Sequence, residues 1–74
     1  MQRFLRLKEL RKETGKTQAQ IAEILSVRQN TYSQYENGQR EIPLSMLIFL
    51  AQHYDVSVDY ILGLTEVETP YPKY

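Results

Sequence analysis

The apolar residues of this chain recur three or four positions apart, in segments that each end within about a dozen residues. This spacing is typical of short helices that bury one face. Three of the segments are followed by Gly15, Gly38 and Gly63. Glycine often closes a helix because it adopts the left-handed conformation without strain. No segment has the convincing alternation of a strand, so the pattern predicts an all-α domain.

The predicted helices have recognisable boundaries. Their expected ranges are 3–14, 18–25, 29–36, 43–54 and 58–62. Thr17 and Gln20 form the pattern of a capping box, in which each side chain accepts from the backbone N–H of the other residue. Pro43 suits the first turn of the fourth helix, and Ser57 suits the cap of the fifth. The expected core side chains are Phe4, Leu7, Leu10, Ile21, Ala22, Ile24, Leu25, Tyr32, Tyr35, Leu44, Leu47, Ile48, Leu50, Ala51, Tyr54, Val58, Ile61 and Leu62.

Length and composition exclude several classes of protein. The 74 residues allow one domain, expected at 1–64, with a tail at 65–74 that is either mobile or laid on the surface. The absence of cysteine excludes disulfide scaffolds and thiol catalysis, and it fits a cytoplasmic location. The longest apolar run, 46–51, is far too short to span a membrane, so we expect no membrane association.

The residue sets of enzymes and metal sites are also missing from the sequence. His53 is the single histidine, and without cysteine or a second histidine it is better explained as a structural or exposed residue than as a metal ligand. Glu9 and Glu13 lie four apart among basic neighbours, which favours a solvated salt-bridge face over an acid–base pair. The serines lack the histidine and aspartate of a catalytic triad. We therefore expect no enzymatic activity, no cofactor, no metal and no small-molecule ligand.

The formal net charge is zero, but the charges are divided unevenly along the chain. Residues 1–40 carry eight basic and four acidic side chains, whereas residues 41–74 carry one basic and five acidic side chains. Such asymmetry indicates a charged partner for one half. Four basic residues of the first predicted helix are candidates for phosphate contact. Any one of them is best explained as ordinary surface charge, but as a group they predict that one or two contact phosphates. They are Arg3, Arg6, Lys8 and Lys12.

The third predicted helix has two chemically different faces. Tyr32 and Tyr35 form an apolar face that can pack on the core. The opposite face carries Gln29, Asn30, Ser33 and Gln34. Amide side chains can pair with the major-groove edge of adenine, and the second helix of a helix-turn-helix is the one that enters the groove. Composition alone explains this face equally well as a solvated surface.

Three motifs nevertheless occur together at a fixed spacing. They are the runs TQAQIA at 17–22, YENG at 35–38 followed by Arg40 and Glu41, and DVSVDYIL at 55–62. In this combination the chain resembles the Xre/Cro/C1-type helix-turn-helix regulators of phages and bacteria, over about residues 3–64. The resemblance implies a compact five-helix, lambda-repressor-like fold that binds a double-stranded DNA operator.

The resemblance also implies roles for individual residues. Gln29, Asn30 and Gln34 match base-contacting positions of the recognition helix. Gln18 matches a position that contacts a phosphate and braces the glutamine of the recognition helix, and Asn37 matches a second phosphate contact. Beyond the resemblance, Ser33 is expected among the base contacts because it shares their helix face, and Thr17, Arg28 and Arg40 are expected among the phosphate contacts, with guanine as the alternative for Arg28. Arg11 and Glu36 match a salt bridge that joins the first helix to the third.

The chain departs from the family pattern at three positions. Ser26 stands where the turn usually has glycine, so we expect either a different turn or mild strain there. Arg28 replaces the usual serine or threonine cap of the third helix, which loses about 1 kcal/mol of capping but adds a positive charge beside the groove. Tyr32 replaces an aliphatic residue and should widen the contact with the second helix.

Together these features predict a sequence-specific DNA-binding transcriptional regulator, expected to be a repressor. One recognition helix reads only a few base pairs, so we expect a homodimer that reads half-sites roughly 34 Å apart. The candidates for the dimer surface are Val58, Ile61, Leu64 and Val67. The alternative is a helix-turn-helix that serves as a protein-interaction module, such as an antirepressor or an antitoxin subunit.

Overall fold

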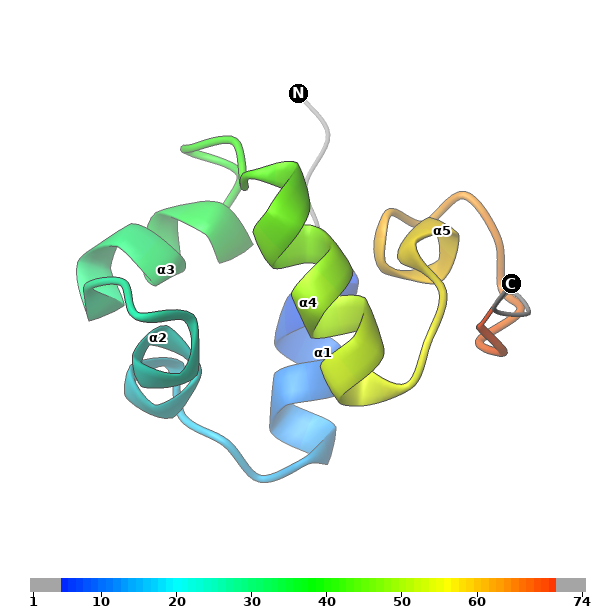
Figure 1. Cartoon of the computed structure of the whole chain (residues 1–74), viewed down its shortest axis with the longest axis horizontal. Coiled ribbons are helices and arrows are strands. Elements are labelled where there is room, and N and C mark those ends of the chain that lie inside the picture. The colour runs from blue at the N-terminus through cyan, green and yellow to red at the C-terminus, as the bar shows by residue number, and fades with distance from the viewer. Residues whose placement is uncertain (1–4, 71–74) are drawn as a thin grey trace.

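The computed structural model describes residues 5–70 and contains five helices over that range (Figure 1). They are α1 (Leu5–Glu13), α2 (Gln18–Leu25), α3 (Gln29–Glu36), α4 (Leu44–Tyr54) and α5 (Val58–Ile61). No strand occurs in residues 5–70, so the all-α prediction is confirmed. The expected start of the first helix, with Arg3 and Phe4, lies outside the described residues, as does the end of the tail at 71–74.

Local hydrogen bonds explain where the helices begin. The capping box is present: the Gln20 N–H donates to Thr17 Oγ1 at 3.1 Å, and the Thr17 N–H donates to Gln20 Oε1 at 2.8 Å. Ser57 caps α5 by accepting from the Tyr60 N–H at 3.0 Å. Arg28 precedes α3 and makes no side-chain cap hydrogen bond, as the sequence predicted.

Two residues other than glycine close helices in the left-handed conformation. Ser26 ends α2 at φ 59° and ψ 39°, which confirms that serine occupies a position better suited to glycine. Asp55 ends α4 at φ 57° and ψ 48°, a conformation that no pattern in the sequence predicts. Both turns redirect the chain within a few residues, so α3 and α5 each follow closely on the preceding helix.

The core is a single cluster to which every helix contributes. Its buried apolar members are Leu7, Leu10, Ile21, Ala22, Tyr32, Tyr35, Ile42, Leu47, Leu50, Ala51, Val56 and Ile61. Both tyrosines of α3 therefore pack inward as predicted, and Tyr32 is fully buried. Ile61 was predicted both for the core and for a dimer surface; it belongs to this core and is 1% exposed, so the core prediction is confirmed and the dimer-surface prediction is wrong.

Three expected core residues are instead at the surface. Ile24 is 39% exposed, Leu44 is 67% exposed and Ile48 is 42% exposed. On α4 the buried stripe consists of Leu47, Leu50 and Ala51. The helix carries more apolar residues than one buried face can hold, and the surplus points outward.

α3, which carries the candidate base-contacting residues, and the tail lie at opposite ends of the molecule. α2 packs against α3, α1 packs against α3 and α5, and α4 packs against α5. Figure 1 shows α4 crossing in front of α1, with α2 and α3 on one side and α5 on the other. The fold therefore leaves one face of α3 free of other helices.

The described part of the tail lies on the surface beside α1 and α5. The Arg6 guanidinium donates to the carbonyl of Thr65 at 2.7 Å and to that of Tyr60 at 3.1 Å, and it lies 4.1 Å from the centre of the Tyr60 ring. The Ser57 N–H donates to the carbonyl of Glu68 at 3.0 Å. Arg6 thus holds the tail at the end of the molecule away from α3, and it is a poor candidate for phosphate contact.

The described helices contain none with the length and apolar character needed to cross a membrane. Among residues 5–70, no three His, Cys, Asp or Glu side chains gather closely enough to hold a metal ion.

Candidate nucleic-acid interface

The exposed face of α3 is polar and carries no formal charge. Gln29 and Asn30 are exposed in its first turn, and Ser33 and Gln34 are half-buried one turn later. The single acidic residue of the helix, Glu36, is on the inner side and 4% exposed. What this face presents is therefore a set of amide and hydroxyl groups, which both donate and accept hydrogen bonds.

Four of the predicted contact residues share one open concavity. It is lined by Gln18, Gln29, Asn30 and Ser33. The concavity forms where the start of α2 meets the outer face of α3, because the tight turn at Ser26 folds the two helices against each other. Asn37 lies at the far end of α3, and its side-chain amide donates to Ser33 Oγ at 3.5 Å. Thr17, Gln34, Arg28 and Arg40 do not line this concavity.

Positive charge flanks α3 at both ends. Arg28 directly precedes the helix and Arg40 follows it, and both side chains are exposed. Thr17 is exposed at the N-cap of α2, but its hydroxyl already accepts from the Gln20 N–H. The two arginines therefore place cations on either side of an uncharged helix face, an arrangement suited to phosphates that border a groove.

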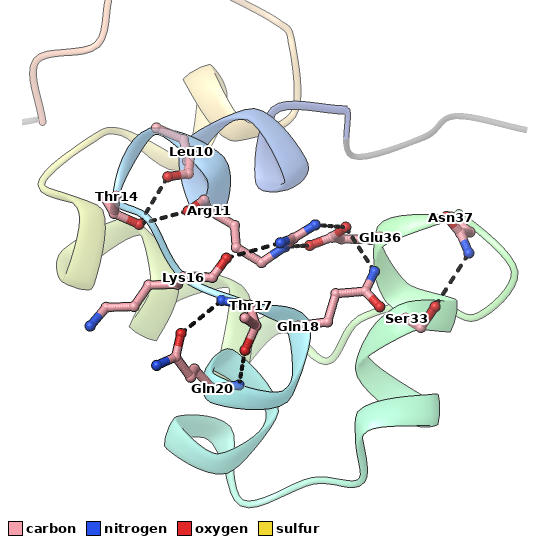
Figure 2. A network of polar contacts seen from close by, with 10 residues as sticks. All are labelled: Leu10, Arg11, Thr14, Lys16, Thr17, Gln18, Gln20, Ser33, Glu36 and Asn37. Carbon is pink, nitrogen blue, oxygen red and sulfur yellow. Dashed lines mark hydrogen bonds and ion pairs between the residues drawn. The ribbon is translucent and has the colours of Figure 1, made fainter.

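A buried ion pair fastens α3 to α1 (Figure 2). Arg11 Nε donates to Glu36 Oε2 at 2.6 Å, and Arg11 Nη2 donates to Glu36 Oε1 at 3.3 Å. Arg11 Nη1 donates to the carbonyl of Lys16 at 3.0 Å. The guanidinium thus holds both α3 and the segment that leads into α2. The family resemblance implied the pair of Arg11 and Glu36 but not the contact with Lys16.

The charges of this pair persist at neutral pH. Burial by itself would raise the pKa of Glu36, but the polar groups of Arg11, Tyr32 and Gln18, with Arg11 the strongest, outweigh burial and hold that pKa below its ordinary value. The hydrogen bond to Glu36 raises the pKa of Arg11 despite burial. Burial also raises the pKa of Tyr54 to about 12 and that of Tyr32 well above its ordinary value, so both phenols stay neutral. The Tyr54 hydroxyl has no hydrogen-bond partner among the described residues.

Gln18 extends this network to the surface. Its Nε2 donates to Glu36 Oε1 at 3.2 Å, and Figure 2 shows its side chain turned toward the carboxylate. Gln18 is the first residue of α2 and is half-buried. Sequence reasoning proposed Gln18 for phosphate contact and missed its bond to Glu36, because the two residues lie 18 positions apart and no local pattern joins them.

Comparisons with known proteins agree with this geometry. A family model described as helix-turn-helix matches residues 7–61. The uncharacterized HTH-type transcriptional regulator YobD of Bacillus subtilis is 46% identical over 65 residues, which cover 88% of this chain and 58% of that protein. The HTH-type transcriptional regulator ImmR of Bacillus subtilis is 44% identical over 62 residues, covering 84% of this chain and 49% of that protein.

A more distant similarity joins the chain to the antitoxin PezA of Streptococcus pneumoniae. The two are 31% identical over 68 residues, which cover 92% of this chain and 43% of PezA. This chain therefore spans about half the length of the relatives that it matches. No solved structure gives a significant match.

Proposed function

The chain belongs to the helix-turn-helix family, and on that basis we propose that it binds double-stranded DNA sequence-specifically and regulates transcription as a repressor. We propose that the protein binds DNA without catalysing a reaction and that it acts in the cytoplasm. The observation that carries the proposal is the uncharged outer face of α3, bordered by Arg28 and Arg40. A helix of this kind can enter the major groove, where base edges accept and donate hydrogen bonds.

The proposed contacts divide into two classes. Gln29, Asn30, Ser33 and Gln34 would contact base edges. Gln18, Arg28, Asn37, Thr17 and Arg40 would contact phosphates. Support comes from the shared concavity of Gln18, Gln29, Asn30 and Ser33 and from the exposure of both arginines. Phosphate contacts position the protein, and base contacts determine the sequence it prefers.

Replacing Gln29 with alanine should weaken binding to the preferred duplex by about 1–3 kcal/mol and relax the preference at one base pair. The physical reason is the loss of a bidentate amide contact in the groove. The duplex is first obtained by selecting bound sequences from a random pool, and affinity is then measured by fluorescence anisotropy. Thr69→Ala, at an exposed polar residue of the tail and away from both α3 and the outer face of α4, is the control and should bind as the wild type does. Unchanged affinity of the Gln29→Ala protein would remove α3 as the reading helix.

The same measurement at several salt concentrations separates this proposal from its alternative. Arg28→Ala should weaken binding to all sequences alike and lower the slope of log K against log salt by about 1. A wild-type protein whose affinity for random duplex does not depend on salt would instead favour a protein partner. That alternative is a protein-interaction module, such as an antirepressor or an antitoxin subunit. The similarity to an antitoxin is the reason for testing it.

We also propose that the protein acts as a homodimer, because one eight-residue recognition helix reads too few base pairs for useful specificity. Of the residues that the sequence suggested for the dimer surface, Ile61 is buried and Val58 is half-buried. Leu64 and Val67 are exposed, at 68% and 62%. They remain candidates on the α5 side.

The outer face of α4 is the better candidate for this contact. It exposes Leu44, Ile48 and Phe49, and α4 contains no Lys, Arg, Asp or Glu. Two copies of this helix can therefore meet about a two-fold axis without bringing like charges together. Exposed apolar residues that gather on one uncharged helix face are also typical of surfaces that become buried when two protein copies associate.

Ile48→Glu should convert the dimer to a monomer, because it places two buried carboxylates against each other at the α4 contact. Leu64→Glu is the matched control on the α5 side and should leave the dimer intact. Sedimentation equilibrium of both variants and the wild type measures the association. A monomeric Leu64→Glu protein with a dimeric Ile48→Glu protein would move the interface to α5.

A further inference from the structure

We infer that Glu36 is a positioning residue for DNA recognition: its buried carboxylate sets the orientation of the Gln18 side-chain amide at the edge of the reading surface. The inference rests on the proposed function and adds a residue that does not itself touch DNA. It starts from the hydrogen bond that joins Gln18 Nε2 to Glu36 Oε1 at 3.2 Å.

The chemistry of the carboxylate decides which end of the amide faces it. An ionised carboxylate only accepts hydrogen bonds, so Gln18 must present its NH₂ group to Glu36 and not its oxygen. The lowered pKa of Glu36 keeps the carboxylate ionised at neutral pH. The Gln18 Oε1 acceptor and the second N–H therefore remain for groups in the concavity, which Gln18 lines together with Gln29 and Asn30.

Glu36 itself has little freedom to move. It is 4% exposed, and both carboxylate oxygens are bound by Arg11, at 2.6 and 3.3 Å. Arg11 also binds the carbonyl of Lys16, two residues before Gln18. The backbone at the start of α2 and the end of the Gln18 side chain are thus tied to the same buried pair, as Figure 2 shows. A rotamer-rich side chain is held in one orientation before DNA arrives, which lowers the entropy cost of binding.

A purely structural role for Glu36 makes a different prediction. If the carboxylate only fastens α3 to α1, removing Gln18 weakens DNA binding by the same factor whether or not Glu36 is present. If the carboxylate also orients Gln18, removing Gln18 has little further effect once Glu36 has been replaced. A double-mutant cycle measured on DNA affinity distinguishes these cases.

The experiment compares the wild type with Gln18→Ala, Glu36→Gln and the double variant on the selected duplex. Thr69→Ala, in the exposed tail, is the control. Affinity is measured at a temperature where circular dichroism shows each protein folded. We expect Gln18→Ala to weaken binding about tenfold, as for one lost hydrogen-bonding side chain, and Thr69→Ala to have no effect. Glu36→Gln should weaken binding at least as much, and the double variant should be within about twofold of Glu36→Gln alone. Multiplying effects of the two substitutions would overturn the inference while leaving the proposed function in place.

A second measurement covers a Glu36→Gln protein that does not fold. In the wild type, nuclear magnetic resonance of the Gln18 side-chain NH₂ should show one proton shifted downfield of its counterpart in Gln52, because a charged acceptor binds it. Equal shifts in the two glutamines would overturn the inference. A wild-type protein that selects no duplex from the random pool would overturn the proposed function and, with it, the role of Glu36 in DNA recognition.

Discussion

Arg11→Met is expected to destabilise the domain by about 3–5 kcal/mol, because it leaves the buried Glu36 carboxylate without its partner. Glu36 is 4% exposed, and its ion pair with Arg11 has an Nε–Oε2 distance of 2.6 Å. A chain of this size has a total stability of about 4–11 kcal/mol, so the loss is a large part of the whole. Urea unfolding followed by circular dichroism measures it directly.

Two further variants separate charge burial from loss of helix contacts. Lys12→Met, at the exposed neighbouring position of α1, should change the free energy of unfolding by less than about 0.5 kcal/mol. The double variant Arg11→Met/Glu36→Met should recover much of the lost stability, since apolar replacement of a whole buried pair is often neutral. A loss below about 1 kcal/mol in Arg11→Met would show that water reaches the pair and that it does not fasten α3 to α1.

Leu50→Ala is the second large expected loss, at about 2–5 kcal/mol. Leu50 is fully buried at the middle of the core face of α4, so removing its side chain leaves a cavity that the surrounding helices fill only in part. The matched control is Leu44→Ala on the same helix, where the side chain is 67% exposed. In dilute protein, where the monomer predominates, the expected change in its free energy of unfolding is below about 0.5 kcal/mol, because little apolar surface is taken from or returned to water.

The comparison of these two leucines tests the placement of α4 itself. If Leu50→Ala and Leu44→Ala lowered the free energy of unfolding equally, α4 would have to be rotated about its axis so that both leucines contact the core. A greater effect of Leu44→Ala in concentrated protein than in dilute protein would instead support the proposed dimer contact at α4, because dissociation then contributes to the measured stability.

The sequence predicted the features of the fold that depend on neighbouring residues. The capping box of Thr17 and Gln20 and the inward face of Tyr32 and Tyr35 were predicted correctly, and of the two alternatives for Ser26 the structure has the strained, left-handed turn. Each depends on backbone geometry or side-chain spacing within one turn of helix. The polar outer face of α3 follows from the same spacing, because two buried positions fix the direction of the others.

Other features could not be predicted because they depend on residues far apart in the chain. Periodicity assigned Leu44 and Ile48 to the core, but the neighbouring helices cover only one side of α4. No sequence pattern distinguished Arg6 from the other basic residues of α1, yet its side chain binds the carbonyl of Thr65, 59 positions away. The bond between Gln18 and Glu36 likewise has no sequence signal.

The amino-acid sequence by itself determined where the helices begin and end and which side of α3 is polar, because caps, turns and helical faces are set by residues within about four positions of one another. Only the tertiary structure decided which apolar residues the core has room for and how Arg11, Glu36 and Gln18 join in one network. Burial and buried hydrogen bonds require groups from distant parts of the chain to meet, and local patterns contain no information on which groups those are.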